Sequence, residues 1–170
     1  MRNADRDKLM NVGIAAAGNA ADFSIARELF DEYARELGID LCFQNFSTEL
    51  ANLGTMYAAP TGRLLLAHGD GLIIGCVGVR RLSRSACEMK RLYVRAVARG
   101  SGIGRRLAKA SIEAARDLGY DIMLLDTLAA MAAAQDLYRS LGFRETPPYY
   151  ANPLPRVTYM KLSLRSIPAE

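Results

Sequence analysis

Apolar residues recur along the chain with two different periods, and these periods predict strands that alternate with helices. Apolar spacings of three and four indicate one face of an amphipathic helix, and short apolar runs next to glycine indicate strands. The runs of strand type are residues 12–17, 63–68, 72–79, 87–94, 120–126 and 157–164. Helical spacing follows Asp22 and Ile103 and recurs from Ala130 to Leu141. It is only partly kept in residues 39–62, where we expect one short helix between loops.

The order of these elements is β-α-α-β-β-β-α-β-α-β, which predicts an α/β domain with a mixed sheet. The pair Asp70–Gly71 supplies the positive φ angles of a tight turn, so residues 63–68 and 72–79 should form a hairpin. Residues 87–126 hold a strand, a glycine loop, a helix and a second strand. This unit should form one right-handed parallel crossover.

The composition places the chain among single-domain globular proteins. It has 170 residues, 51% of them apolar, and its longest apolar run of eight residues is too short to cross a bilayer. The charged first ten residues argue against a secretory signal. The three cysteines, Cys42, Cys76 and Cys87, lack CxxC spacing and predict reduced, buried thiols in a cytoplasmic protein. With His68 as the only histidine, we expect no metal site and a structural role for that side chain.

Charge is distributed unevenly along the chain. Residues 1–79 carry six Lys or Arg and ten Asp or Glu, whereas residues 80–106, the basic block, carry nine Lys or Arg and only Glu88 as an acid. Such a block attracts nucleic acid, a membrane surface or a phosphorylated cofactor, or it is simply a solvated face. Eight of the nine cations are arginines, which favours recognition of phosphate. Base stacking is poorly supported, because Tyr93 is the only aromatic residue in the block.

The sharpest local motif is a glycine loop, Arg99-x-x-Gly102-x-Gly104, between a predicted strand and a predicted helix. Glycines let the backbone approach a ligand, and the unpaired N–H groups of a helix start attract anions such as a pyrophosphate. A nucleotide-binding P-loop would need Lys and Ser or Thr after the last glycine, where this chain has Arg105 and Arg106. Arg105 also takes the third glycine position of a dinucleotide fingerprint, so that interpretation is weaker.

Two segments resemble the GNAT superfamily of acyl-CoA-dependent N-acetyltransferases. The stretch CEMKRLYVRAVARGSGIGRRL is similar to that family's cofactor motif, Gln/Arg-x-x-Gly-x-Gly/Ala, and LYRSLGF at residues 137–143 is similar to its LYxxxGF element. The resemblance is strong over residues 87–164. It implies one domain over residues 1–170, with a cofactor core at about 87–143. The implied sheet is mixed and mostly antiparallel, flanked by helices, with one parallel β-α-β crossover.

The resemblance also implies roles for individual residues. Strands 87–94 and 120–126 would splay apart to admit the arm of acetyl-CoA, and the loop amides would hold its pyrophosphate. The implied cofactor residues are Leu92, Tyr93, Val94, Arg99, Gly100, Ser101, Gly102, Ile103, Gly104 and Arg105. Tyr138 matches the family tyrosine near the cofactor sulfur, and Glu88 matches the general base of one subgroup. Met131 departs from the pattern, because many members carry Asn there to contact the pantetheine arm.

The chemistry expected of these residues is acetyl transfer from a thioester to an amine. Glu88 would accept the amine's proton if partial burial raised its pKa; otherwise it would form a salt bridge with Lys90, Arg91 or Arg95. Tyr138 would hydrogen-bond or protonate the departing sulfur, or it would simply pack in the core. A strand bulge near Leu92 would free a backbone N–H for the developing oxyanion.

The acceptor side is harder to assign from sequence. Aromatic residues could line an apolar pocket, with Glu49 attracting a cationic amine; these aromatics are Phe43, Phe46, Tyr57, Tyr149 and Tyr150. The leading interpretation is a cytoplasmic N-acetyltransferase for a small or peptide amine, without a metal, nucleic-acid or membrane partner. Family members are often homodimers. The alternatives are a non-catalytic acyl-CoA-binding regulatory module and a nucleic-acid-binding module.

Overall fold

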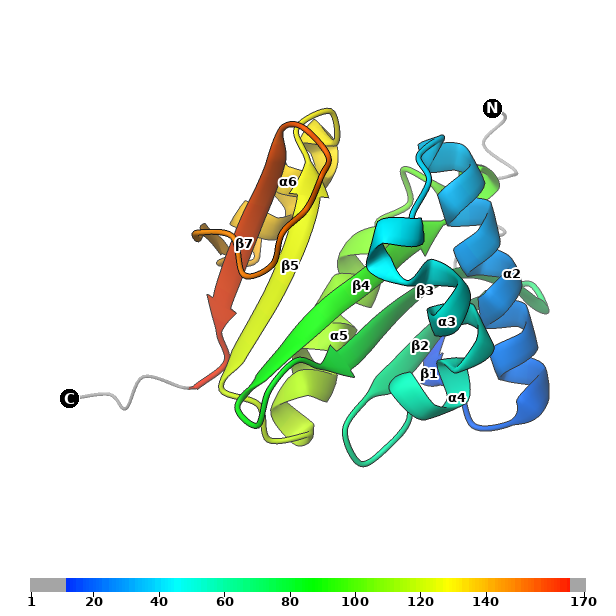
Figure 1. The fold of residues 1–170 in the computed structure, drawn as a ribbon. Helices are drawn as coiled ribbons and strands as arrows, with labels where there is room; N and C mark the ends of the chain where they lie inside the picture. The colour runs from blue at the N-terminus through cyan, green and yellow to red at the C-terminus, as the bar shows by residue number, and fades with distance from the viewer. Residues whose placement is uncertain (1–11, 166–170) are drawn as a thin grey trace.

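The computed structural model describes residues 12–165, which form one seven-stranded sheet in the order β1-β2-β3-β4-β5-β7-β6 (Figure 1). The strands are β1 Gly13–Ala16, β2 Arg63–Gly69, β3 Leu72–Arg81, β4 Ala86–Val94, β5 Ile122–Leu128, β6 Arg144–Glu145 and β7 Val157–Ser163. Every neighbouring pair is antiparallel except β4 and β5, which are parallel. The predicted fold class, a mostly antiparallel mixed sheet with one parallel crossover, is confirmed.

Helices cover both faces of the sheet (Figure 1). They are α2 Ala20–Leu37, η1 Cys42–Gln44, α3 Phe46–Ala51, α4 Leu53–Met56, η2 Ala96–Ala98, α5 Ile103–Asp117 and α6 Ala132–Ser140. Helices α2 to α4 pack on one face, where Phe30, Leu53 and Tyr57 form one core with β2 and β3. Helices α5 and α6 pack on the other face, where Leu107 and Phe143 belong to a second core.

Several element boundaries differ from the sequence-based expectations. Helix α2 is capped by the Asn19 side chain, which accepts a hydrogen bond from the Asp22 N–H, so Asp22 lies inside the first turn. Residues 39–62 form three short helical pieces rather than one helix. Strand β6 has only two residues and carries no periodic signal. The hairpin at Asp70–Gly71 is confirmed, with both residues at positive φ.

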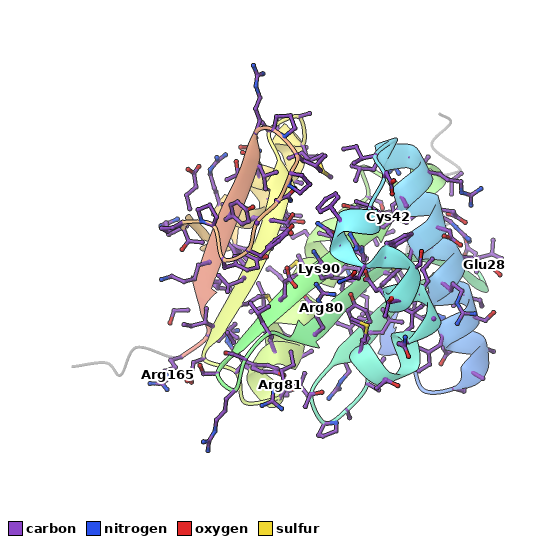
Figure 2. All side chains as sticks on the ribbon, in the orientation of Figure 1. Glu28, Cys42, Arg80, Arg81, Lys90 and Arg165 are labelled. Atoms are coloured by element: carbon purple, nitrogen blue, oxygen red, sulfur yellow. The ribbon has the colours of Figure 1, made fainter. Side chains whose placement is uncertain are left out.

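The cysteines divide into two classes. Cys76 and Cys87 are buried free thiols, as expected, and burial raises the pKa of Cys87 to about 12. Cys42 is exposed at the start of η1, so the expectation of a buried thiol was wrong there (Figure 2). The reason is local: residue 42 lies on a short 3-10 turn that turns away from both cores. No helix within residues 12–165 is long and apolar enough to cross a bilayer.

The sheet opens between β4 and β5. The two strands pair only through Ala86–Ile122, Cys87–Met123 and Glu88–Leu124. β4 continues to Val94 without β5 beside it, and Figure 1 shows the two strands diverging. The backbone of β4 beyond Glu88 therefore pairs with β3 on one side and faces an opening on the other. This confirms the predicted splay.

A bulge lies in β4 beside the opening. The β3–β4 register passes from Gly78↔Lys90 to Cys76↔Tyr93, so Arg91 and Leu92 together oppose Val77. Arg91 has a φ of 56°, which is left-handed backbone. Because a bulge breaks the strict alternation of side chains, Lys90 and Arg91 both reach the same face and both donate to Gln44 Oε1. The predicted bulge near Leu92 is confirmed.

Candidate functional site

The glycine loop forms an anion-binding helix start. Gly100 and Gly102 have φ angles of 77° and 81°, and α5 begins at Ile103 without a side-chain cap. Among residues 12–165, no protein acceptor takes the N–H groups of residues 100–105. The first turn of α5 contains no acidic residue. Uncapped amides at the positive end of a helix favour a bound anion, so the loop has the chemistry that a pyrophosphate needs.

The arginines near this loop have partners of their own. Arg99 donates to the Val94 carbonyl at 2.8 Å and forms an ion pair with Glu36 of α2. Arg105 is exposed and donates to the Ser140 hydroxyl at 2.9 Å. The backbone amides, rather than unpaired arginine side chains, are therefore the feature that sets this loop apart.

The basic block is largely neutralised within the fold. Five of its nine cations form ion pairs, in which the basic residues are Arg80, Lys90, Arg91, Arg95 and Arg99. Four of the acidic partners come from α2, α3 and β4, namely Glu32, Glu36, Glu49 and Glu88. The charge asymmetry along the sequence therefore stabilises the packing of the N-terminal helices on β4.

Two adjoining cavities follow the open side of β4. The first, of about 50 Å³, lies at the splay between residues 89–92 of β4 and residues 125–128 of β5. The second, of about 270 Å³, passes residues 92–94 and reaches Arg99 at the glycine loop. They share walls formed by Tyr33, Leu37, Leu92 and Met131. Together they follow the open side of β4 from Arg99, next to the glycine loop, to the gap in the sheet, a course that suits an extended ligand.

Tyr138 of α6 lies at the inner end of this path. It lines the first cavity, is 8% exposed, and packs edge-on against Phe143 with ring centroids 5.8 Å apart. Its hydroxyl makes no hydrogen bond to residues 12–165. Burial raises its pKa, with smaller contributions from Tyr33 and Asp126, so the phenol keeps its proton at neutral pH. The ring packs in the core, as one of the two expectations had it, and the residue also lines the cavity, while its role toward the sulfur stays a prediction.

Glu88 is a buried member of a charge network. It is 1% exposed and contacts Arg80 at 2.9 Å, Lys90 at 3.4 Å and the Tyr149 hydroxyl at 2.6 Å (Figure 2 labels Arg80 and Lys90). Burial raises its pKa, but Lys90, Arg80 and the Tyr149 hydrogen bond outweigh burial, so the net pKa is lowered. The expectation of a raised pKa was wrong, because desolvation was considered without these partners. The ion-pair partners are Arg80 and Lys90, not Arg91 or Arg95.

A second carboxylate, Asp126, was missed in the sequence. It lines the first cavity at the open end of β5, where it contacts Lys90 at 3.3 Å and accepts hydrogen bonds from Tyr150 and Asn152. Lys90 bridges the two carboxylates, Glu88 and Asp126, and is itself 5% exposed. The available signal was one acidic residue in an otherwise apolar strand, which is unfavourable unless the acid has partners.

The residues expected to line an acceptor pocket do not lie together in the structure. Tyr57 is buried against Phe30, and Glu49 is 1% exposed and bound by Arg91 and the Tyr57 hydroxyl. Glu49 is therefore not available to a cationic amine, contrary to the expectation. Tyr149 and Tyr150 do lie at the splay, through their hydrogen bonds to Glu88 and Asp126.

The other two aromatic residues expected on the acceptor side, Phe43 and Phe46, are partly buried. Phe46 stacks on the Arg91 guanidinium at 5.1 Å, and Phe43 is half-buried on η1. His68 is exposed beside the hairpin turn, away from the cavities. Within residues 12–165, no three His, Cys, Asp or Glu side chains are placed to hold a metal ion.

Comparison with known proteins gives one consistent family. The sequence profile described as the acetyltransferase (GNAT) domain matches residues 60–145. A protein of Schizosaccharomyces pombe named an uncharacterized N-acetyltransferase is 43% identical over 159 residues, covering 92% of this chain and 98% of the relative.

Solved structures share the fold. A GNAT-family acetyltransferase from Staphylococcus aureus has a TM-score of 0.74 at 22% identity, covering 91% of this chain and all of the other. An acetyltransferase from Salmonella typhimurium, solved with its cofactor acetyl-CoA, has a TM-score of 0.66 at 22% identity, covering 94% of this chain and 98% of the other.

Proposed function

Because the chain belongs to the GNAT family of acetyltransferases, we propose that it moves the acetyl group of acetyl-CoA to a primary amine by direct attack on the thioester. The family uses acetyl-CoA, and the chain is an acyltransferase. The observation that supports the proposal is the pair of adjoining cavities that lead from Arg99, beside the uncapped amides of the glycine loop, to the opening between β4 and β5. The acceptor is a small-molecule or peptide amine.

The residues along this path fit an acyl-CoA. Amides of residues 100–105 would hold the pyrophosphate, and the open backbone edge of β4 at residues 92–94 would pair with the amides of the pantetheine arm. The bound thioester would supply an activated acetyl carbon. At the Arg91–Leu92 bulge, where regular pairing with β3 is interrupted, a backbone N–H would stabilise negative charge at the splay.

Proton transfer would involve carboxylates at or next to the first cavity: Asp126 lines it, and Glu88 contacts Lys90, which lines it. An amine with the ordinary lysine pKa is almost fully protonated at pH 7, so a base must take its proton. We propose Glu88 for this role, with Asp126, which lines the cavity, as the competing carboxylate. Tyr138 keeps its proton because burial raises its pKa, and it would donate that proton or a hydrogen bond to the departing sulfur.

The test begins with binding. Thermal unfolding is measured with acetyl-CoA, free CoA, NAD and an oligonucleotide. Each ligand is present at about 100 times its dissociation constant, if that constant is about 1 μM. We expect both CoA species to raise the unfolding temperature by about 5–10 °C, from a linkage energy near 2.7 kcal/mol. NAD and the oligonucleotide should leave it unchanged. Thiol release over a library of amines then identifies the acceptor; stabilisation by the oligonucleotide alone would contradict the proposal.

Two further expectations stay predictions. A cytoplasmic location rests on the cysteine usage. A homodimer rests on the resemblance to the family, and light scattering of the purified chain would test it.

A further inference from the structure

Side chains cross the gap in the sheet where backbone pairing has ended. The last rung between β4 and β5 joins Glu88 to Leu124. At and beyond this rung, side-chain contacts link the two halves of the sheet, from Tyr149 to Glu88 at 2.6 Å, from Lys90 to Asp126 at 3.3 Å and from Gln44 to Tyr150 at 2.9 Å. Gln44 differs from the others because it comes from η1, 106 positions before its partner. One neutral side chain therefore joins two segments that are far apart in the sequence.

The Gln44 amide contacts both walls of the first cavity, which it also lines. Its Oε1 atom accepts hydrogen bonds from Arg91 Nη1 at 2.9 Å and from Lys90 Nζ at 3.4 Å. Guanidinium and ammonium groups can only donate, so they fix the amide oxygen toward β4 and leave the amide nitrogen to face the other wall. There Nε2 donates to the Tyr150 hydroxyl at 2.9 Å.

The direction of the next hydrogen bond follows from the donors around Tyr150. Asn152 Oδ1 accepts the Leu154 N–H at 3.0 Å, so Asn152 Nδ2 faces the Tyr150 hydroxyl and donates to it at 2.8 Å. The Tyr150 oxygen thus accepts from two amides, and its single proton goes to Asp126 Oδ2 at 2.9 Å. Hydrogen bonds in such a chain strengthen one another. Gln44 therefore acts on Asp126 through the Tyr150 hydroxyl.

The placement of Asp126 affects both carboxylates that compete to accept the proton of the amine. Asp126 lines the first cavity and contacts Lys90 through its other oxygen at 3.3 Å. Lys90 in turn contacts Glu88 at 3.4 Å. A misplacement of about 1 Å in a reacting group can lower a rate about 100-fold. A residue that fixes Asp126 can therefore control turnover without touching the reacting atoms.

We propose that Gln44 is a positioning residue for acetyl transfer and that it acts on Asp126 through the Tyr150 hydroxyl. This inference rests on the proposed function, because it assigns a further role within the same site. Gln44 carries no charge, so it orients Tyr150 without changing the charge balance of the ion pairs around Lys90 and Arg91. Its contacts lie away from the glycine loop, so its role concerns the transfer step and not the binding of CoA.

The test begins with Gln44→Met, which keeps the length of the side chain and removes the amide. Turnover is measured as thiol release from saturating acetyl-CoA with glycinamide, benzylamine and putrescine as probe amines. It should fall about tenfold, because Asp126 loses part of its support. In calorimetric titrations the dissociation constant for CoA should stay within about twofold of the wild type. A purely structural role would not separate turnover from CoA binding in this way.

A second variant, Gln44→Glu, isolates the contact that crosses the gap. It keeps an oxygen for Lys90 and Arg91 but replaces the donor to Tyr150 with an acceptor, which competes with Asp126 for the phenol proton. It should lose turnover to a similar extent while its unfolding temperature stays close to that of the wild type. If Gln44→Met fails to fold, Gln44→Glu decides the question.

A double variant tests the route through Tyr150. Tyr150→Phe removes the hydroxyl that joins Gln44 to Asp126, and it should also lower turnover about tenfold. Gln44→Met combined with Tyr150→Phe should be within about threefold of the slower single variant, because both changes break the same chain. Losses that multiply would show that Gln44 does not act through Tyr150, and would overturn the inference.

Gln135→Met is the matched control. Its amide also donates at 2.9 Å, to the Leu128 carbonyl, but Gln135 lies outside the cavity walls, so turnover should stay within about twofold of the wild type. Wild-type turnover in both Gln44 variants, or a parallel loss of CoA affinity and turnover, would overturn the inference. A wild-type protein that binds neither CoA nor acetyl-CoA would instead remove the proposed function itself.

Discussion

The two strands that border the gap in the sheet hold their polar side chains in different ways. On β4, Arg91 is buried against Glu49, with N–O distances of 2.7 and 3.2 Å, and Gln44 completes its contacts. On β5, Asp126 is held by residues from β4 and from the loop before β7, and Thr127 has no partner among residues 12–165. Side chains of both strands line the first cavity, but Arg91 of β4 is tied to the N-terminal helices, whereas Asp126 of β5 is not.

This difference indicates that the two walls of the gap have different roles. The Arg91–Glu49 pair links β4 to α3, and Arg95 and Arg99, which follow β4, form ion pairs with α2, so this wall is held in place by the N-terminal helices. Such preorganisation is what a transfer reaction needs, because groups fixed before binding cost nothing to order during the reaction. Changes at the Arg91–Glu49 pair should therefore appear mainly in stability, and changes of the proposed proton-transfer groups, Glu88, Asp126 and Tyr138, mainly in turnover.

The largest expected effect is on stability, from Glu49→Ala. This change leaves the Arg91 guanidinium buried without its carboxylate and removes the acceptor of the Tyr57 hydroxyl. Breaking a buried ion pair on one side costs about 3–5 kcal/mol, which urea unfolding would measure. Glu36→Ala is the matched control, because its pair with Arg99 is half-exposed and should contribute less than about 1 kcal/mol.

A double variant sharpens this prediction. Glu49→Leu combined with Arg91→Met removes both charges and should be less destabilised than Glu49→Ala alone. If Glu49→Ala instead had the same free energy of unfolding as the wild type, the Arg91–Glu49 pair would not stabilise the β4 wall. The contrast drawn between β4 and β5 would then be wrong.

How much of this could be predicted from sequence depends on how far apart the contributing residues are. The glycine loop was predicted because its amides come from the six consecutive residues 100–105, and local chemistry decides their conformation. The gap in the sheet followed from the family resemblance. The charged cluster did not, since Gln44 and Tyr150 are 106 positions apart and no short pattern links them to Asp126.

The basic block is a second example of contacts that the sequence alone does not reveal. Its nine cations were visible in the sequence, but their partners Glu32, Glu36 and Glu49 lie some 40 to 60 positions earlier. Sequence-based reasoning about net charge left the block as either a surface for a polyanion or a solvated face. The fold instead brings the acidic first third of the chain onto it, which only the packing of α2 and α3 reveals.

The next effect in size is on turnover, from Tyr138→Phe. Loss of the phenol should lower turnover about 10- to 100-fold, the lower range for a positioned acid. The fold should be kept, because the ring still packs edge-on against Phe143. Thiol release at saturating acetyl-CoA measures the change, and Tyr120→Phe, far from the cavities, is the control. Full turnover in Tyr138→Phe would leave this tyrosine a core residue only.

Glu88→Gln should have a smaller effect on stability than Glu49→Ala, and the size of this effect depends on pH. The pKa of Glu88 is lowered in the fold, so its ionised form stabilises the protein above the ordinary value of 4.5, and this contribution is lost as pH falls below it. At pH 7 the variant should be less stable by about 1–2 kcal/mol. Below pH 4.5 the difference in unfolding free energy between the two proteins should narrow.

The same variant decides which carboxylate accepts the proton. With its pKa lowered, Glu88 is ionised throughout pH 6–9, so it should contribute no inflection to the pH–rate profile in that range, and the profile should follow the amine. Asp126→Asn is the matched change on the opposite wall. The variant with the larger loss of turnover, about 100-fold or more for a lost general base, identifies the acceptor. A Glu88→Gln enzyme with an unchanged turnover and pH–rate profile would place Glu88 with Arg91 among the anchors of β4, and the proton transfer would belong to β5.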